Sequence, residues 1–278
     1  QISRASSARG GLFFVESLRR EGLPSGLVTA TRGNHGQSIA IGAREVGIPA
    51  LIVVPEGNSA EKNAAMEAFG GELLIAGRGF DEARQVAARE GAARQFLMVP
   101  PFHREIVKGV ATYGWELLTE VPDLDAVFVP IGMGSGICAL IAIRNLLGLK
   151  TEIIGVVAER APAFALSYRA RQPVTGSGVS TFADGVACCE PQEEPLAIIL
   201  AGAADVVAVS KDEISEAIRV LYEATHNVAE GAGAAVPAGA IKLRERYMHK
   251  KIATVLTGGN IDRDIAARIL AGHTPSAS

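Results

Sequence analysis

Short apolar segments rich in branched side chains alternate along the chain with longer segments in which apolar residues recur at helical spacing. This alternation predicts an α/β fold in which parallel strands are joined by helices. Most of the strand segments are apolar at every position, which is typical of strands covered on both faces. The expected strands are 26–30, 50–54, 72–76, 96–99, 126–130, 153–158, 206–209 and 252–257. The principal expected helices are 36–46, 59–69, 81–94, 104–120, 136–147, 211–223 and 230–247.

Composition narrows the classes of protein to which the chain can belong. Of its 278 residues 48% are hydrophobic and 21% are charged, so a sizeable core is expected and disorder is not. The net charge of −3 gives no electrostatic basis for binding nucleic acid. No apolar run approaches the ~20 residues that span a bilayer, so no membrane partner is expected. The three cysteines, Cys138, Cys188 and Cys189, form neither a disulfide framework nor a metal-ligand spacing, and we expect a soluble cytoplasmic protein.

Three strand-to-helix turns carry unusual residues, and the first follows the strand 126–130. It is the glycine-rich turn Gly132-Met133-Gly134-Ser135-Gly136, which leads into a helix. Backbone N–H groups and the helix dipole at such a turn favour a phosphate group, and glycine lets the anion approach the backbone. The turn lacks the Lys-Ser/Thr of a Walker A loop, and its G-x-G-x-G spacing differs from the dinucleotide fingerprint. A nucleotide site that uses Glu159 after the next strand remains an alternative, as does a purely structural turn.

The second turn, Thr31-Arg32-Gly33-Asn34-His35, follows the strand 26–30 and also enters a helix. The Asn34 amide offers a donor and an acceptor, and the surrounding N–H groups suit a carboxylate. His35 is either a general base or a packed capping group, and Arg32 either pairs with an anion or is solvated. The third turn begins at Thr257, whose hydroxyl suits a ring nitrogen of a ligand or a nearby backbone group.

Taken in this order, the three turns resemble the fold-type II family of pyridoxal-phosphate (PLP) enzymes that includes threonine dehydratases, serine dehydratases and serine racemases. The resemblance covers essentially the whole chain and includes further segments at 55–58, 182–185 and 230–233. It implies two α/β domains with parallel twisted sheets flanked by helices and a cleft between them. The smaller domain would span 26–107, and the larger would combine 1–25 with 108–278, without the residues that precede this segment in the family.

The resemblance also implies roles for the three turns. Gly132 to Gly136 would hold the cofactor phosphate, Asn34 would contact the phenolic oxygen of the ring, and Thr257 would face the pyridine nitrogen. The remaining residues of the second turn would bind the substrate; they are Thr31, Arg32, Gly33 and His35. No metal site is expected, because Ala163 and Ala165 lie where metal-dependent relatives carry an aspartate beside the position of Glu159.

The cofactor-binding lysine of the family is missing from its expected position. The family carries a segment like Q-P-T-G-A-F-K-x-R-G-G, in which the lysine forms the Schiff base. A gapless match to residues 1–11 places Ser7 on the lysine and Ser6 on the phenylalanine. The first lysine of the chain, Lys62, lies in a helix that looks solvated and is a poor substitute.

The resemblance therefore implies a PLP-dependent ammonia-lyase that converts a hydroxy amino acid to a 2-keto acid and ammonia, impaired because of Ser7. A serine cannot supply the amine and is a weak base. Two alternatives remain: a PLP- or amino-acid-binding relative without turnover, and a nucleotide-dependent oxidoreductase. A small hydroxy amino acid is the expected substrate, and a homodimer or homotetramer is the expected assembly.

Overall fold

The computed structural model describes residues 5–176 and 181–276, and within them the chain forms two compact units. The first unit ends at Val110 and the second begins at Ala111. Each unit contains a four-stranded sheet in which all strand pairs are parallel. The expected α/β fold with two parallel sheets flanked by helices is therefore confirmed.

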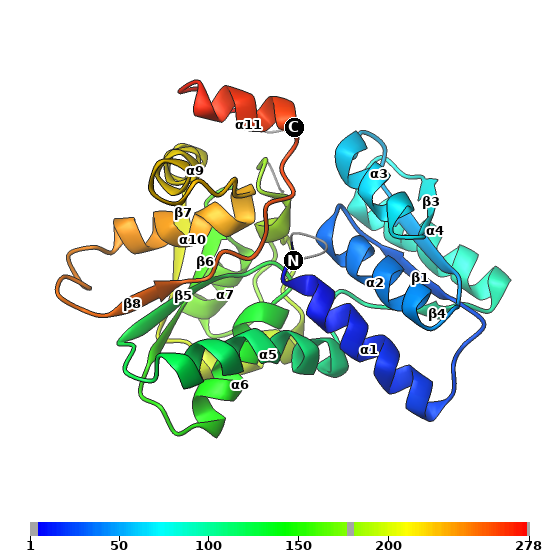
Figure 1. The fold of residues 1–278 in the computed structure, drawn as a ribbon, viewed down its shortest axis with the longest axis horizontal. Helices are drawn as coiled ribbons and strands as arrows, with labels where there is room; N and C mark the ends of the chain where they lie inside the picture. Colours follow the sequence, from blue (N-terminus) through cyan, green and yellow to red (C-terminus); the bar gives the residue numbers. More distant parts are fainter. Residues whose placement is uncertain (1–4, 177–180, 277–278) are drawn as a thin grey trace. The chain divides into compact units, whose positions relative to one another are not determined.

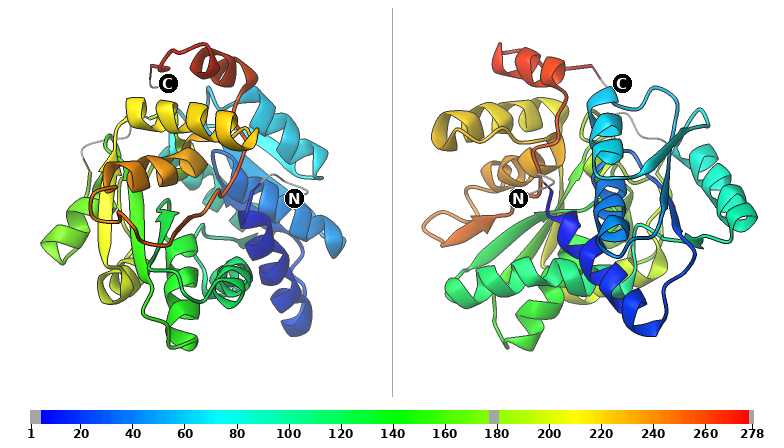
Figure 2. Two further views of the ribbon diagram at one scale, coloured as in Figure 1. Left: turned by 60° about the vertical axis from the view of Figure 1, so that its left-hand side comes forward. Right: turned by 45° about the vertical axis from the view of Figure 1, so that its right-hand side comes forward.

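The first sheet has the strand order β3-β2-β1-β4, with β1 and β2 in its centre. Every residue of these two strands is buried, because α4 covers one face and α2 the other (Figure 1; Figure 2, right). The elements of this unit are α1 (Ser7–Glu21), β1 (Leu27–Ala30), α2 (Asn34–Glu45), β2 (Ala50–Val54), α3 (Ala60–Ala68), β3 (Glu72–Ile75), α4 (Phe80–Arg94) and β4 (Leu97–Met98).

Helix α1 packs closely on α2 within the first unit. A side chain at Gly11 would collide with Ser38 of α2, and Gly42 lies so close that its Cβ would be 2.9 Å from the Gly11 carbonyl. The glycines thus let the two helix backbones approach each other. Residues 1–25 were expected to join the larger domain, but the described part of this segment belongs to the first unit because of this packing.

The second sheet has the strand order β7-β6-β5-β8, with α10 on one face and α6 on the other (Figure 1). Helix α5 (Arg104–Glu120) begins in the first unit and ends in the second. The other elements of the second unit are β5 (Ala126–Pro130), α6 (Ser135–Leu146), β6 (Glu152–Ala158), α7 (Ala163–Ala170), the 3-10 turn η1 (Asp184–Val186), α8 (Glu193–Gly202), β7 (Asp205–Val209), α9 (Lys211–Thr225), α10 (Gly231–Lys242), β8 (Ile252–Thr254) and α11 (Arg263–Leu270).

Strand β8 ends earlier than the apolar pattern predicts. It was expected to reach Thr257 but ends at Thr254, and after Val255 donates its N–H to the Phe128 carbonyl the chain leaves the sheet. Thr257 therefore lies in a turn beyond the strand. Among the helices of the described residues, none is both long and apolar enough to cross a bilayer.

Candidate functional site

The glycine-rich turn connects β5 to α6 in the second unit. Gly134 is the N-cap of α6 and has φ +98°, a conformation that residues with a Cβ rarely adopt. A Cβ at Gly134 would also lie 2.7 Å from the Pro195 side chain, and one at Gly132 would collide with the Gly185 carbonyl. Gly136 is different, because its nearest neighbours would be 3.7 Å and 3.9 Å away. The first two glycines are needed to form the turn, whereas a Cβ at the third would meet its neighbours at ordinary van der Waals distance.

The turn presents a row of backbone donors. Within residues 5–176 and 181–276, the N–H groups of Gly132 through Gly136 donate no hydrogen bond, and the Ser135 hydroxyl has no partner either. Five consecutive unsatisfied N–H groups at the start of a helix form a site for an anion, to which the helix dipole adds a positive potential. The arrangement fits the phosphate group of the implied cofactor.

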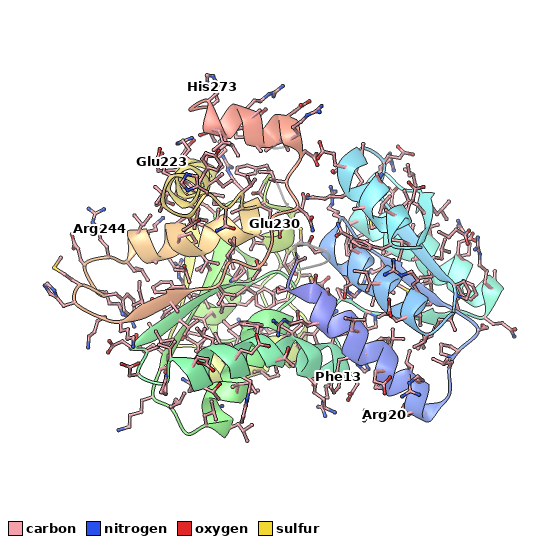
Figure 3. All side chains as sticks on the ribbon, in the orientation of Figure 1. Phe13, Arg20, Glu223, Glu230, Arg244 and His273 are labelled. Atoms are coloured by element: carbon pink, nitrogen blue, oxygen red, sulfur yellow. The ribbon has the colours of Figure 1, made fainter. Side chains whose placement is uncertain are left out.

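Thr257 lies at the same edge of the second sheet. Its turn follows β8, which pairs in parallel with β5, so the two turns leave neighbouring strands at their carboxyl ends. The turn rests on the start of α10, where the N–H of the buried Glu230 donates to the Gly258 carbonyl at 3.1 Å (Figure 3). The half-buried Thr257 hydroxyl has no hydrogen bond within the described part of the chain, so it is available to a ligand.

In the first unit, Asn34 is the first residue of α2, directly after the turn that follows β1. Thr31 is only 5% exposed, and its hydroxyl accepts from the N–H groups of Gly33 (3.0 Å) and Gly36 (3.3 Å). Thr31 therefore shapes the turn, and its hydroxyl already has protein partners. The predicted substrate role of these residues remains a proposal.

His35 is tied into the interior of the first unit. Its Nε2 lies 3.1 Å from the Thr29 hydroxyl, which donates to the Val99 carbonyl at 2.9 Å, so the Thr29 oxygen accepts from the neutral ring. Burial lowers the pKa of His35 to about 4, and a hydrogen bond to the Val99 backbone only partly opposes this. The ring is thus neutral at pH 7 and packed, which makes it a weak proton acceptor.

His35 should make the stability of the protein pH-dependent. Its folded pKa of about 4 lies below the unfolded value of about 6.5, so the unfolded state binds more protons between these values. The free energy of unfolding should therefore keep its full value above about pH 6.5 and decrease by up to about 3 kcal/mol as the pH is lowered to 4. Denaturant titrations across this range should show a shallower fall for His35→Gln. The exposed His273 (Figure 3) provides the control, since His273→Gln should keep the parent profile; equal profiles for all three proteins would contradict the assignment.

Ser7, the residue at the expected lysine position, begins α1 and is close to the Asn34 turn. Its hydroxyl donates to the Asn34 carbonyl at 3.2 Å, and the Ser38 hydroxyl donates to the Ser7 carbonyl at 2.7 Å. The Gly11 N–H in turn donates to the Ser38 hydroxyl at 3.0 Å. Ser7 and Asn34 are thus brought together within one unit, and the Ser7 hydroxyl donates to a carbonyl group, which is too weak a base to take its proton.

Two cationic side chains of the first unit lie in or beside the Thr31–His35 turn. Arg32 is half-buried and forms no hydrogen bond or ion pair with any residue the structure describes. Lys62 was expected in a solvated helix, yet it is half-buried, and a Cβ at Gly33 would lie 3.1 Å from its Cδ. The position of Lys62 near the turn was missed because the contact joins the N-cap of α2 to α3 and has no signal in the local pattern.

The residues present fit part of the implied cofactor. The glycine-rich turn suits the phosphate and Thr257 offers a neutral hydroxyl, but Ser7 supplies no amine for a covalent bond. Glu159, which was considered for a nucleotide ribose, follows β6 and is exposed. In the described residues no three His, Cys, Asp or Glu side chains form a group that could hold a metal ion.

Comparison with known proteins extends over nearly the whole chain. Residues 3–258 match the family described as pyridoxal-phosphate dependent enzyme. The L-threonine ammonia-lyase of Geobacter sulfurreducens is 36% identical over 94% of this chain, which spans 65% of that relative. The L-threo-3-hydroxyaspartate ammonia-lyase of Saccharomyces cerevisiae is 31% identical, over 95% of this chain and 81% of the relative. The processed threonine deaminase isoform 2 of Solanum lycopersicum superposes with a TM-score of 0.91 at 32% identity, covering 98% of this chain and 81% of that one.

Proposed function

The chain belongs to the family of pyridoxal-phosphate dependent enzymes, and on this premise we propose that it is an ammonia-lyase-type protein that binds the cofactor without a covalent bond. The observation that carries the proposal is the row of five unsatisfied N–H groups at Gly132 to Gly136. A phosphate dianion there would accept several charge-assisted hydrogen bonds, each worth about 1.5–3 kcal/mol. This is enough for affinity without a covalent bond.

The substrate we propose is a small hydroxy amino acid such as threonine or serine. The L-threonine ammonia-lyase and the L-threo-3-hydroxyaspartate ammonia-lyase among the relatives support this class. Family membership also argues against a nucleotide-dependent oxidoreductase. The Asn34 and Thr257 turns would have no role in such an enzyme.

Different residues of this chain would bind different parts of the cofactor and the substrate. When bound, pyridoxal phosphate supplies an electron sink for the negative charge that develops on the substrate α-carbon. Met133 and Ser135 would complete the phosphate turn, and the neutral hydroxyl of Thr257 would interact with the ring nitrogen and leave it largely unprotonated. Asn34 would hold the phenolic oxygen, and the carboxylate of the amino acid would bind at the Thr31–His35 turn, where Arg32 would add positive charge.

Proton removal is the step that this chain performs poorly. The Ser7 hydroxyl donates to the Asn34 carbonyl, which is too weak a base to activate it. His35 has a low pKa and its Nε2 is bonded to Thr29, so it does not replace the missing amine. We therefore propose slow deamination, and a protein that binds cofactor and amino acid without turnover is the alternative that the Ser7 hydrogen bond favours.

A titration with pyridoxal phosphate tests the proposal. We expect an absorbance change that saturates at one cofactor per chain, and we expect borohydride to leave the cofactor removable by dialysis. Mass spectrometry of the reduced sample should find no cofactor on Lys62, the lysine whose stem lies against Gly33. Stoichiometric labelling of Lys62 would contradict non-covalent binding, and no saturable binding would refute the proposed function. Keto-acid production from threonine or serine then separates slow turnover from none.

A further inference from the structure

A tyrosine on α5 is bonded to the glycine-rich turn. The hydroxyl of Tyr113 donates to the Gly136 carbonyl at 2.9 Å, although the two residues are 23 positions apart. Packing of α5 on α6 fixes this arrangement, since a Cβ at Gly114 would touch the Leu140 side chain at 3.3 Å. The tyrosine therefore reaches the second residue of α6, at the row of unsatisfied N–H groups.

This bond is additional to what the helix requires. Gly136 lies in the first turn of α6, where the α-helical pattern already gives its carbonyl the Leu140 N–H as a donor. The tyrosine bond therefore satisfies no orphan carbonyl, and its effect is to fix the position of Gly136 relative to α5. Burial raises the pKa of Tyr113, so the hydroxyl remains a donor throughout the physiological range.

The Tyr113 hydroxyl also lies close to the side-chain position of Gly136. A Cβ at Gly136 would find the Tyr113 oxygen 3.9 Å away and the Val129 side chain 3.7 Å away, both at ordinary contact distance. An anion bound by the N–H groups of this turn meets no side chain from Gly136 itself. The alignment of these N–H groups depends on where the first turn of α6 is held, and Tyr113 is bonded directly to that turn.

We propose that Tyr113 is a positioning residue for the phosphate group of the cofactor, acting through Gly136. This inference rests on the proposed function, because it assumes that the phosphate binds at Gly132–Gly136. It adds a residue from α5 to a phosphate site that the sequence assigned only to the glycine-rich turn.

The test is Tyr113→Phe, which removes the hydroxyl and keeps the ring. Pyridoxine 5′-phosphate is a suitable probe because it has no aldehyde and cannot react with lysine. Loss of one hydrogen bond of about 0.5–1.5 kcal/mol should weaken its binding roughly 2- to 13-fold. Inorganic phosphate should compete less well by a similar factor, while the melting temperature of the ligand-free protein should change no more than in the control.

Tyr168→Phe is the matched control. The Tyr168 hydroxyl also donates to a backbone carbonyl at 2.9 Å, that of Ala203, and it is part-buried like Tyr113. This variant should bind the probe like the parent. Equal affinity in the parent and Tyr113→Phe would overturn the inference alone. A parent that binds neither probe would overturn the proposed function together with it.

Discussion

Replacing Ser7 with lysine should give a protein that forms a borohydride-reducible bond with pyridoxal phosphate and deaminates threonine or serine at least about 100-fold faster than the parent. One well-placed general base contributes about 100-fold or more to a rate, and here a single residue restores both the covalent bond and the base. The expectation rests on the gapless match of residues 1–11 and on the position of Ser7 beside Asn34. Absorbance spectra, reduction followed by mass spectrometry, and a keto-acid assay would measure it.

Ser6→Lys is the control for this experiment, because it adds the same charge one residue earlier, at the N-cap of α1. It should give neither a stoichiometric reducible bond nor a comparable gain in rate. Thermal melting must first establish that Ser7→Lys is folded, since the change removes the hydrogen bond to Asn34. A folded Ser7→Lys protein that binds the cofactor but forms no reducible bond would refute the alignment and the site assigned from it.

Replacing Gly134 with valine should weaken cofactor binding at least about 100-fold. A β-branched residue at φ +98° is strained, and its Cβ would lie 2.7 Å from Pro195, so the turn must move and its N–H groups lose their common direction. Loss of two charge-assisted hydrogen bonds of about 1.5 kcal/mol each corresponds to this factor. A binding titration with pyridoxine 5′-phosphate measures the change.

Gly148→Val separates this effect from general destabilisation. Gly148 follows the other end of α6 and also has positive φ, at +65°, but no atom lies within 4 Å of its expected Cβ. The variant should therefore lose stability through backbone strain and keep its affinity for the probe. If the two valine variants bound the probe equally well, the turn would be structural and the phosphate would have to bind elsewhere.

Elements bounded by clear turn residues were predictable residue by residue. Strands β2 and β5 and helix α5 have the bounds that the apolar pattern predicts, because buried parallel strands are apolar throughout. Helix α10 was expected to continue to Tyr247 but ends at Lys242. The apolar spacing continues past this end because Tyr247 packs edge-on against Phe128, with ring centroids 5.2 Å apart. Apolar periodicity reports burial, and burial continues after the helix has ended.

Candidate site residues could be proposed from the sequence where their signal is local. Each turn is a contiguous segment with its own chemistry, so Gly132 to Gly136, Asn34 and Thr257 could be selected from the sequence. Two contacts near the site connect elements that are distant in sequence: Tyr113 is bonded to Gly136, and Lys62 approaches Gly33. No spacing along the chain encodes these contacts. For the same reason the packing of α1 on α2 could not be inferred from the presence of Gly11 in the sequence.

The pairing of β8 with β5 has a consequence for the order in which the site can assemble. Ala126 pairs with Ile252, so this edge of the sheet is complete only when β8, which lies far later in the chain, has paired with the strand that carries the glycine-rich turn. During synthesis the phosphate turn therefore emerges long before the Thr257 turn, and joining the two requires closure of a long loop. A ligand that contacts both turns can stabilise only the completed unit by mass action, and it gives no assistance to a nascent chain that lacks β8.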